Sequence, residues 1–267
     1  MAPRSPLLTV MVGAAEKAAR ALKRDFGEIE NLQVSRKGPS DFVSAADIKT
    51  EKTLVAELSK ARPGFGFLLE ESGEMAGSDR DHRWIIDPID GTTNFLHGIP
   101  QFAISIALER AGQLLSGVIL NPITDELFIA ERGGGAFMNN RRIRVSARTR
   151  LGDALIGTGA PFQGRGTAAD HETFLNQLRR VMAETAGIRR MGAAALDLAY
   201  VAAGRFDAFW ELSLNPWDIA AGILLVREAG GMVIDPITAG DPLVTGHVLA
   251  SNATLQDQFK ALVLGKG

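Results

Sequence analysis

Carboxylate side chains stand where short apolar segments end or where a helix begins. The candidates are Glu70, Glu71, Asp87, Asp90 and Asp218. The first two follow the apolar run 65–69, the next two follow the run 84–86, and the last comes directly after Trp217. Acids at the ends of buried strands converge at one edge of a sheet, where binding sites usually form. We therefore expect these carboxylates to share one site.

A shared site of this kind requires cations, because neighbouring carboxylates repel one another and remain ionised only when positive charge neutralises them. Magnesium prefers oxygen ligands and combines carboxylates with water and phosphate oxygens. The chain has no cysteine, which excludes zinc–thiolate sites, disulfides and thiolate catalysis, and its four histidines show no metal-ligand spacing. The residues therefore favour a hard divalent cation such as Mg²⁺ as the cofactor.

The segment DPIDGTT at 87–93 adds groups that suit a phosphate. The carbonyl of Ile89 could complete the shell of a cation, and Gly91 permits close approach of a phosphate to backbone N–H groups. The hydroxyl of Thr92 could bind that phosphate or orient water, and a helix beginning near residue 91 would favour the anion. Each motif alone is also typical of a turn, a solvated face or a helix N-cap. Together they favour metal–phosphate chemistry.

Hydrophobic periodicity predicts the elements that position these groups. Helices are expected at residues 6–26, 47–61, 170–186, 193–203, 218–228 and 254–264. Strands are expected at 65–69, 84–86, 102–109, 114–120, 126–130, 136–138, 155–159, 206–211, 232–234 and 248–251. The strands between 102 and 138 resemble an antiparallel meander, and the small residues of 193–203 suit close helix packing. We expect a single unit over 1–267, with possible lobes at 1–148 (metal-binding) and 149–267 (substrate-binding).

Composition excludes several other classes of protein. The 267 residues are 46% hydrophobic and 22% charged, which is ordinary for a globular chain, and the net charge of −2 predicts no direct nucleic-acid contact. With no apolar run of about 18 residues and no signal-peptide pattern, we expect a cytoplasmic protein without a membrane span. Neither a dinucleotide fingerprint nor a P-loop is present. The arginine run at 141–150 is either a solvated loop and strand edge or a patch that binds a partner or an anion.

Three motifs resemble the inositol monophosphatase family. They are WIIDPIDGTTNF at 84–95, EESG at 70–73, and WDIAAG at 217–222 followed by EAGG at 228–231. The resemblance covers about residues 7–262, and RRMGAAALDLAY at 189–200 is most similar to the bacterial, SuhB-like branch. It implies a mixed α/β fold, the layered αβαβα sandwich of the inositol monophosphatase and fructose-1,6-bisphosphatase type. It also implies a homodimer, magnesium dependence and inhibition by lithium.

The resemblance assigns roles residue by residue. Glu70, Asp87 and the Ile89 carbonyl would hold one magnesium ion, and Asp87, Asp90 and Asp218 a second. A third, weaker site would involve Glu70 through water, with Glu71 nearby. Substrate contacts would fall on Asp90, Gly91, Thr92, Gly192, Ala193, Ala194, Glu211 and Asp218. Lys37 and Asp41 would lie in a mobile loop near the site, and Asp47 would hydrogen-bond the catalytic Thr92.

Some of these residues also have ordinary structural interpretations. Lys37 could be a solvated cation, Glu211 an exposed acid at a strand end, and Asp47 a helix N-cap that is also part of the site.

The expected reaction is hydrolysis of a small phosphomonoester by direct attack of a metal-activated water, without a phosphoenzyme. Glu70, Thr92 and Asp47 are the expected catalytic residues. We expect myo-inositol 1-phosphate as substrate, since Glu211 could accept hydrogen bonds from polyol hydroxyls. The alternatives are fructose 1,6-bisphosphate, histidinol phosphate and adenosine 3′,5′-bisphosphate, although no basic pocket for a second phosphate is evident. A different class of function, a SuhB-like partner of transcription factors, would use Arg189-Arg190 or the arginine run.

Overall fold

The computed structural model describes residues 5–28, 34–38, 41–162 and 166–266. Its helices are α1 (Pro6–Gly27), α2 (Ala45–Ala61), α3 (Thr92–Leu96), α4 (Ala168–Glu184), α5 (Ala194–Ala202), α6 (Pro216–Glu228), α7 (Pro242–Thr245) and α8 (Gln256–Leu264). A short 3₁₀ turn spans Leu151–Asp153. No helix within these ranges is long and apolar enough to cross a membrane.

The described strands form two sheets and a hairpin. The larger sheet holds β3 (Gly66–Leu69), β4 (Gly73–Met75), β5 (His82–Asp90), β6 (Ala103–Arg110), β7 (Gln113–Asn121), β8 (Glu126–Glu131), β9 (Gly135–Met138) and β10 (Arg141–Arg142). The smaller sheet holds β11 (Leu155–Thr158), β12 (Gly187–Arg189), β13 (Ala208–Glu211), β14 (Met232–Ile234) and β15 (Val248–Ser251). The hairpin joins β1 (Val34–Gly38) to β2 (Asp41–Ser44).

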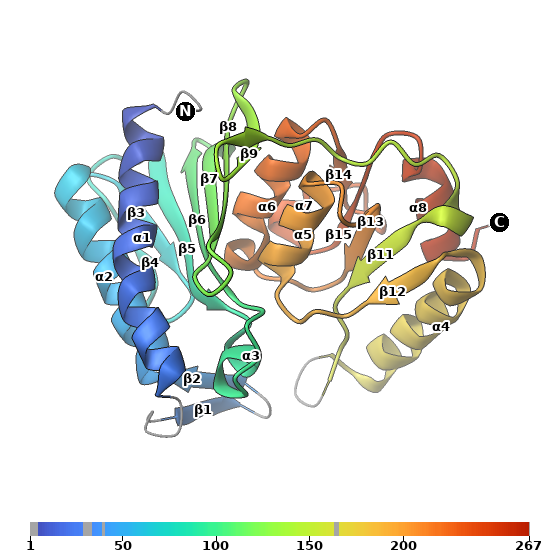
Figure 1. The fold of residues 1–267 in the computed structure, drawn as a ribbon, viewed down its shortest axis with the longest axis horizontal. Coiled ribbons are helices and arrows are strands. Elements are labelled where there is room, and N and C mark those ends of the chain that lie inside the picture. The colour runs from blue at the N-terminus through green and yellow to red at the C-terminus, as the bar shows by residue number, and fades with distance from the viewer. Residues whose placement is uncertain (1–4, 29–33, 39–40, 163–165, 267) are drawn as a thin grey trace.

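Helices and sheets alternate in layers (Figure 1). Helices α1 and α2 cover one face of the larger sheet, α5 and α6 lie between the two sheets, and α4 and α8 cover the outer face of the smaller sheet. Three apolar clusters fill the spaces between these layers. The expected layered αβαβα sandwich is confirmed.

Sheet order explains how separate motifs reach one place. The larger sheet runs β10-β9-β8-β7-β6-β5-β3-β4, and β5 pairs with β3 in parallel and with β6 in antiparallel. Because β3 and β5 are parallel neighbours, Glu70 after β3 and Asp87 within β5 lie at the same end of the sheet. The antiparallel meander expected over 102–138 is confirmed as β6 to β9.

Strand β5 is longer than the strand expected at 84–86. Strand β5 continues to Asp90, and its pairing with β6 slips by one residue, so that Asp87 faces Ser105 but Asp90 faces Ala103. The extra residue is a β-bulge, a place where a strand tolerates proline because a ladder hydrogen bond is already lost. Pro88 occupies this bulge, and Asp87 and Asp90 stand on either side of it.

The segment of Lys37 and Asp41 also differs from expectation. Instead of a loop, the backbone of Lys37 lies in β1 and that of Asp41 in β2, paired antiparallel. Helix α2 begins at Ala45 rather than Asp47, because Ser44 caps it, and α6 begins at Pro216 rather than Asp218. The other elements that the periodicity did not predict are short, namely β4, β10, β12, α3, α7 and the 3₁₀ turn at Leu151–Asp153.

Candidate active site

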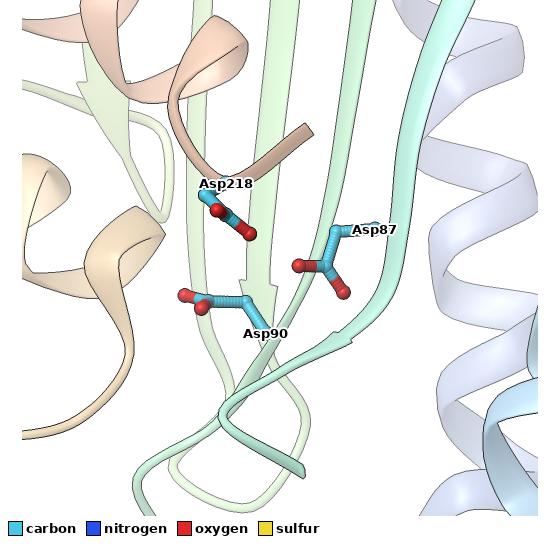
Figure 2. Close-up of side chains that lie close together, drawn as sticks. All are labelled: Asp87, Asp90 and Asp218. Carbon is cyan, nitrogen blue, oxygen red and sulfur yellow. The ribbon is translucent and has the colours of Figure 1, made fainter. Parts of the chain in front are cut away.

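Three aspartates meet beside the bulge of β5. Asp87 and Asp90 come from β5, and Asp218 comes from the first turn of α6, with the three side chains close together (Figure 2). One carboxylate oxygen from each residue lies within 4.8 Å of the other two. Asp87 and Asp90 are buried and Asp218 is half-buried. The predicted convergence of these three residues is therefore present.

The electrostatics of this triad are unfavourable without a counter-ion. Burial, followed by the charges of Glu70, Asp90 and Asp218, raises the pKa of Asp87 well above its usual value. Burial and then the charge of Asp218 raise the pKa of Asp90 to about 8, against hydrogen bonds from the backbone of Ala195 and Ala194. A hydrogen bond between the side chains of Asp87 and Glu70 also favours a protonated carboxyl.

This donor set fits a divalent cation. Carboxylates contribute only oxygen, and a cation placed among them would take over the neutralisation that a shared proton otherwise supplies. Ile89 lines the same cavity, and its carbonyl, 3.1 Å from the Thr92 hydroxyl, is one of two acceptors, with Asp47, within reach of the single hydroxyl hydrogen. A carbonyl oxygen has two lone pairs, so a hydrogen bond from Thr92 leaves one for a further ligand. Glu70 lines the cavity as well but does not belong to the triad within 4.8 Å.

The Thr92 hydroxyl is held from behind by helix α2. Asp47 is buried, and its Oδ1 lies 3.2 Å from the Thr92 hydroxyl. Its Oδ2 accepts hydrogen bonds from the Ser44 N–H at 2.8 Å and the Ser44 hydroxyl at 2.6 Å, forming a capping box. Burial raises the pKa of Asp47, and these hydrogen bonds lower it in part. Asp47 is thus a capping-box residue and a partner of Thr92, so both interpretations of it apply.

Gly91 and α5 bring a second wall to the site. Gly91 has φ +96°, and a Cβ there would meet the carbonyls of Gln101 and Gly192 at 3.0 and 3.2 Å. The buried Asn94 donates to the carbonyls of Gln101 and Met191 at 2.7 and 2.8 Å, which fixes the segment before α5. These contacts allow the Ala195 N–H to donate to the Asp90 Oδ2 at 2.8 Å.

The cavity over the triad has a volume of about 370 Å³. The predicted residues that line it are Glu70, Asp87, Ile89, Asp90, Gly91, Thr92, Gly192, Ala193, Ala194, Glu211 and Asp218. Asp47 lies behind Thr92 rather than at the surface of the cavity. Glu71 is not among the lining residues of the described chain, and its backbone N–H donates to Glu51 at 2.9 Å.

Sequence reasoning missed several residues of this cavity. Asp197, Arg190 and Phe162 line it, and the Arg190 guanidinium lies 5.4 Å from the Phe162 ring centroid. From the sequence, Arg190 is expected only as part of a contact surface for partners. Asp197 is the single acid in a helix otherwise built of apolar residues, Ala194–Ala202. That contrast is the signal that could have identified it.

The layered sandwich and the carboxylate cavity define a class of phosphate-ester hydrolases. The model of the Inositol monophosphatase family matches residues 4–265. A relative from Mesorhizobium japonicum, an inositol-1-monophosphatase, is 63% identical over 95% of this chain and 94% of its own. The chain belongs to the inositol monophosphatase family, and its expected enzyme class is confirmed.

Two further comparisons extend this result. A protein of Pseudomonas aeruginosa named Nus factor SuhB is 47% identical, over 97% of this chain and 94% of its own. The crystal structure of the extragenic suppressor protein suhB from Bartonella henselae superposes with a TM-score of 0.93 at 59% identity. That alignment covers 97% of this chain and 98% of the other.

Proposed function

We propose that this protein is a magnesium-dependent, lithium-sensitive phosphatase of small polyol phosphates, with myo-inositol 1-phosphate as its substrate. The observation that carries this proposal is the triad of Asp87, Asp90 and Asp218 at the base of a cavity large enough for such an ester. The 63% identical inositol-1-monophosphatase supports the choice of substrate.

Each residue of the cavity has a role in the proposal. Glu70, Asp87 and the Ile89 carbonyl would hold one magnesium ion, and Asp87, Asp90 and Asp218 another. When bound, these ions would neutralise the phosphate and leaving-group charge and acidify a water molecule.

The residues around this water would complete the reaction. The Thr92 hydroxyl and Glu70 line the cavity and would orient the attacking water and accept its proton, in an in-line attack without a phosphoenzyme. Asp47, by accepting the hydrogen bond of Thr92, would keep a lone pair of the hydroxyl turned toward the cavity.

A panel of phosphomonoesters tests the substrate, and Asp90→Asn tests the site. We expect hydrolysis of myo-inositol 1-phosphate that requires Mg²⁺ and falls on adding lithium.

In Asp90→Asn, kcat should fall at least 100-fold, because the substitution removes a charge from the triad. The same variant should unfold at a higher temperature when metal-free, since it relieves repulsion. Wild-type turnover in this variant would contradict the assignment.

A second candidate function rests on the 47% identical relative named Nus factor SuhB. We propose that this chain also binds transcription factors, through exposed arginines such as Arg144 and Arg189. Pull-down with purified transcription factors tests it, with Arg144→Ala and Arg189→Ala as variants. Absence of any retained factor counts against this role.

Homodimer formation stays a prediction from the family resemblance and is measured by light scattering.

A further inference from the structure

The cavity contains a buried acid that the proposed reaction does not use. Asp197 lies in the first turn of α5, the residue is 1% exposed, and it lines the cavity. Its Oδ1 has no hydrogen-bond partner among the described residues. Buried polar atoms are nearly always hydrogen-bonded. An oxygen left over at the wall of a cavity therefore indicates a partner that arrives with the ligand.

The surroundings of Asp197 suit a hydroxyl group. Burial, followed by the charges of Glu211 and Asp90, raises the pKa of Asp197 well above its usual value, while Arg190 lowers it. A carboxyl group can accept a hydrogen bond when ionised and donate one when protonated, and a hydroxyl does both.

Gly159 determines where the Glu211 carboxylate lies. A Cβ built on Gly159 would stand 1.9 Å from carboxylate atoms of Glu211. Gly159 does not have the positive φ that favours glycine, so the backbone does not require glycine there. Instead, the lack of a side chain at Gly159 leaves space for the Glu211 carboxylate. Because a carboxylate is the far end of a flexible side chain, the fold would tolerate alanine by moving Glu211 away.

We infer that Asp197 is a specificity-determining residue, which pairs with Glu211 to bind neighbouring hydroxyl groups of a polyol monophosphate. Gly159 is the positioning residue that lets Glu211 take part in this pair. The inference rests on the proposed phosphatase function and adds Asp197 and Gly159 to the residues that select its polyol substrate.

The test compares two esters on the same enzyme. We measure kcat/KM with Mg²⁺ for myo-inositol 1-phosphate and for 4-nitrophenyl phosphate, which lacks polyol hydroxyls. In Asp197→Ala and in Gly159→Ala, the ratio of the two values should fall roughly 10- to 100-fold, mainly through a higher KM for the polyol ester. Asp197→Asn keeps the size and one acceptor oxygen, so its ratio should lie between those of alanine and wild type.

Two matched variants control for structural effects. Asp257→Asn neutralises an exposed first-turn acid of α8, and Gly13→Ala places a Cβ where nothing lies within 4 Å. Neither should change the ratio. If wild type hydrolyses both esters and Gly159→Ala and Asp197→Asn keep the wild-type ratio, the hydroxyl pair is overturned while the phosphatase function stands. If wild type hydrolyses no phosphomonoester, the proposed function itself fails.

Discussion

Asp47 and Asp218 occupy the same position in two different helices. Each is the third helical residue of a capping box, and each accepts a hydrogen bond from the backbone N–H of the capping residue, Ser44 or Asn215. The carboxylate of Asp47 also reaches Thr92, and that of Asp218 joins the triad. The capping box fixes the rotamer of each acid before any ligand binds, so helix formation and preorganisation of the site have one cause.

Asp47→Asn tests this coupling. The Ser44 N–H and hydroxyl both donate to Asp47, so the asparagine must turn its oxygen toward Ser44 and its NH₂ toward Thr92. The Thr92 hydroxyl would then accept from residue 47 and donate to the Ile89 carbonyl, so one of its two lone pairs would no longer be available to orient water. We expect kcat to fall by about 10- to 100-fold with little change in KM, as for loss of general acid–base assistance.

Asp170→Asn is the matched control for this variant. Asp170 holds the same position in the capping box of α4, where Thr167 is the capping residue, and it does not line the catalytic cavity. In steady-state kinetics, kcat should fall in Asp47→Asn and should stay at the wild-type value in Asp170→Asn. Equal kinetics in the two variants would mean that Asp47 acts only as a cap.

Asp235 makes a pH-dependent contribution to stability. It is buried, which alone would raise its pKa, but hydrogen bonds from Thr238 and from the Ile237 N–H outweigh burial and lower the pKa to about 2. Since the folded pKa lies below the unfolded value of 3.8, the stabilisation is present above about pH 4 and is lost as the pH falls toward 2.

Asp235→Asn should therefore lower the free energy of unfolding by about 1–2 kcal/mol at pH 7. Urea unfolding at pH 7 and pH 3 measures the difference between variant and wild type. That difference should shrink at pH 3, where wild type has begun to lose the ionised form. A difference of the same size at both values would show that charge is not the cause.

At the scale of elements, periodicity predicted the long helices and most strands but not the bulge or the short edge strands. The 3.6-residue pattern of α1 arises from one buried face, with Leu8, Met11 and Leu22 on it, and such a pattern is visible in sequence. The slip between Asp87 and Asp90 depends on pairing with β6, a segment that local sequence does not identify. Likewise, Asp197 and Glu211 face one cavity only because the packing of α5 beside β13 brings them together.

A glycine-to-alanine substitution should change the free energy of unfolding in opposite directions at two helix positions. Gly13 is exposed in α1, and a Cβ there meets nothing within 4 Å, so Gly13→Ala should raise the free energy of unfolding by about 0.5–1 kcal/mol. In Gly222 of α6, a Cβ would stand 2.6 Å from the Leu198 side chain of α5. Gly222→Ala should therefore destabilise by about 1–3 kcal/mol. Chemical denaturation of both variants checks the two signs, and equal effects would contradict the close packing of α5 on α6.

At the scale of the whole molecule, the proposed lobes 1–148 and 149–267 share a core. Ile85 and Phe128 of the larger sheet belong to the same apolar cluster as Leu196 of α5 and Ile223 of α6. A core that spans both lobes should make them unfold together. Calorimetry should give one transition whose calorimetric and van't Hoff enthalpies agree. Two resolved transitions would show that the lobes fold independently.

Magnesium should stabilise the whole chain, because its ligands join the two lobes. Asp87 and Asp90 belong to the first and Asp218 to the second, so a bound cation replaces repulsion with attraction across the lobe boundary. A ligand that binds only the folded state adds about 2.7 kcal/mol at 100 times its Kd. For a chain of this size we expect the melting temperature to rise by roughly 5–10 °C.

Thermal unfolding of chelator-treated protein over a magnesium titration measures this rise, with sodium chloride at matched ionic strength as the control. In Asp90→Asn the rise should shrink, while its metal-free melting temperature should exceed that of metal-free wild type. If the melting temperature of wild type does not change with magnesium concentration, this result would contradict a cation site at the triad. An equal rise in wild type and Asp90→Asn would instead place the stabilising cation elsewhere on the molecule.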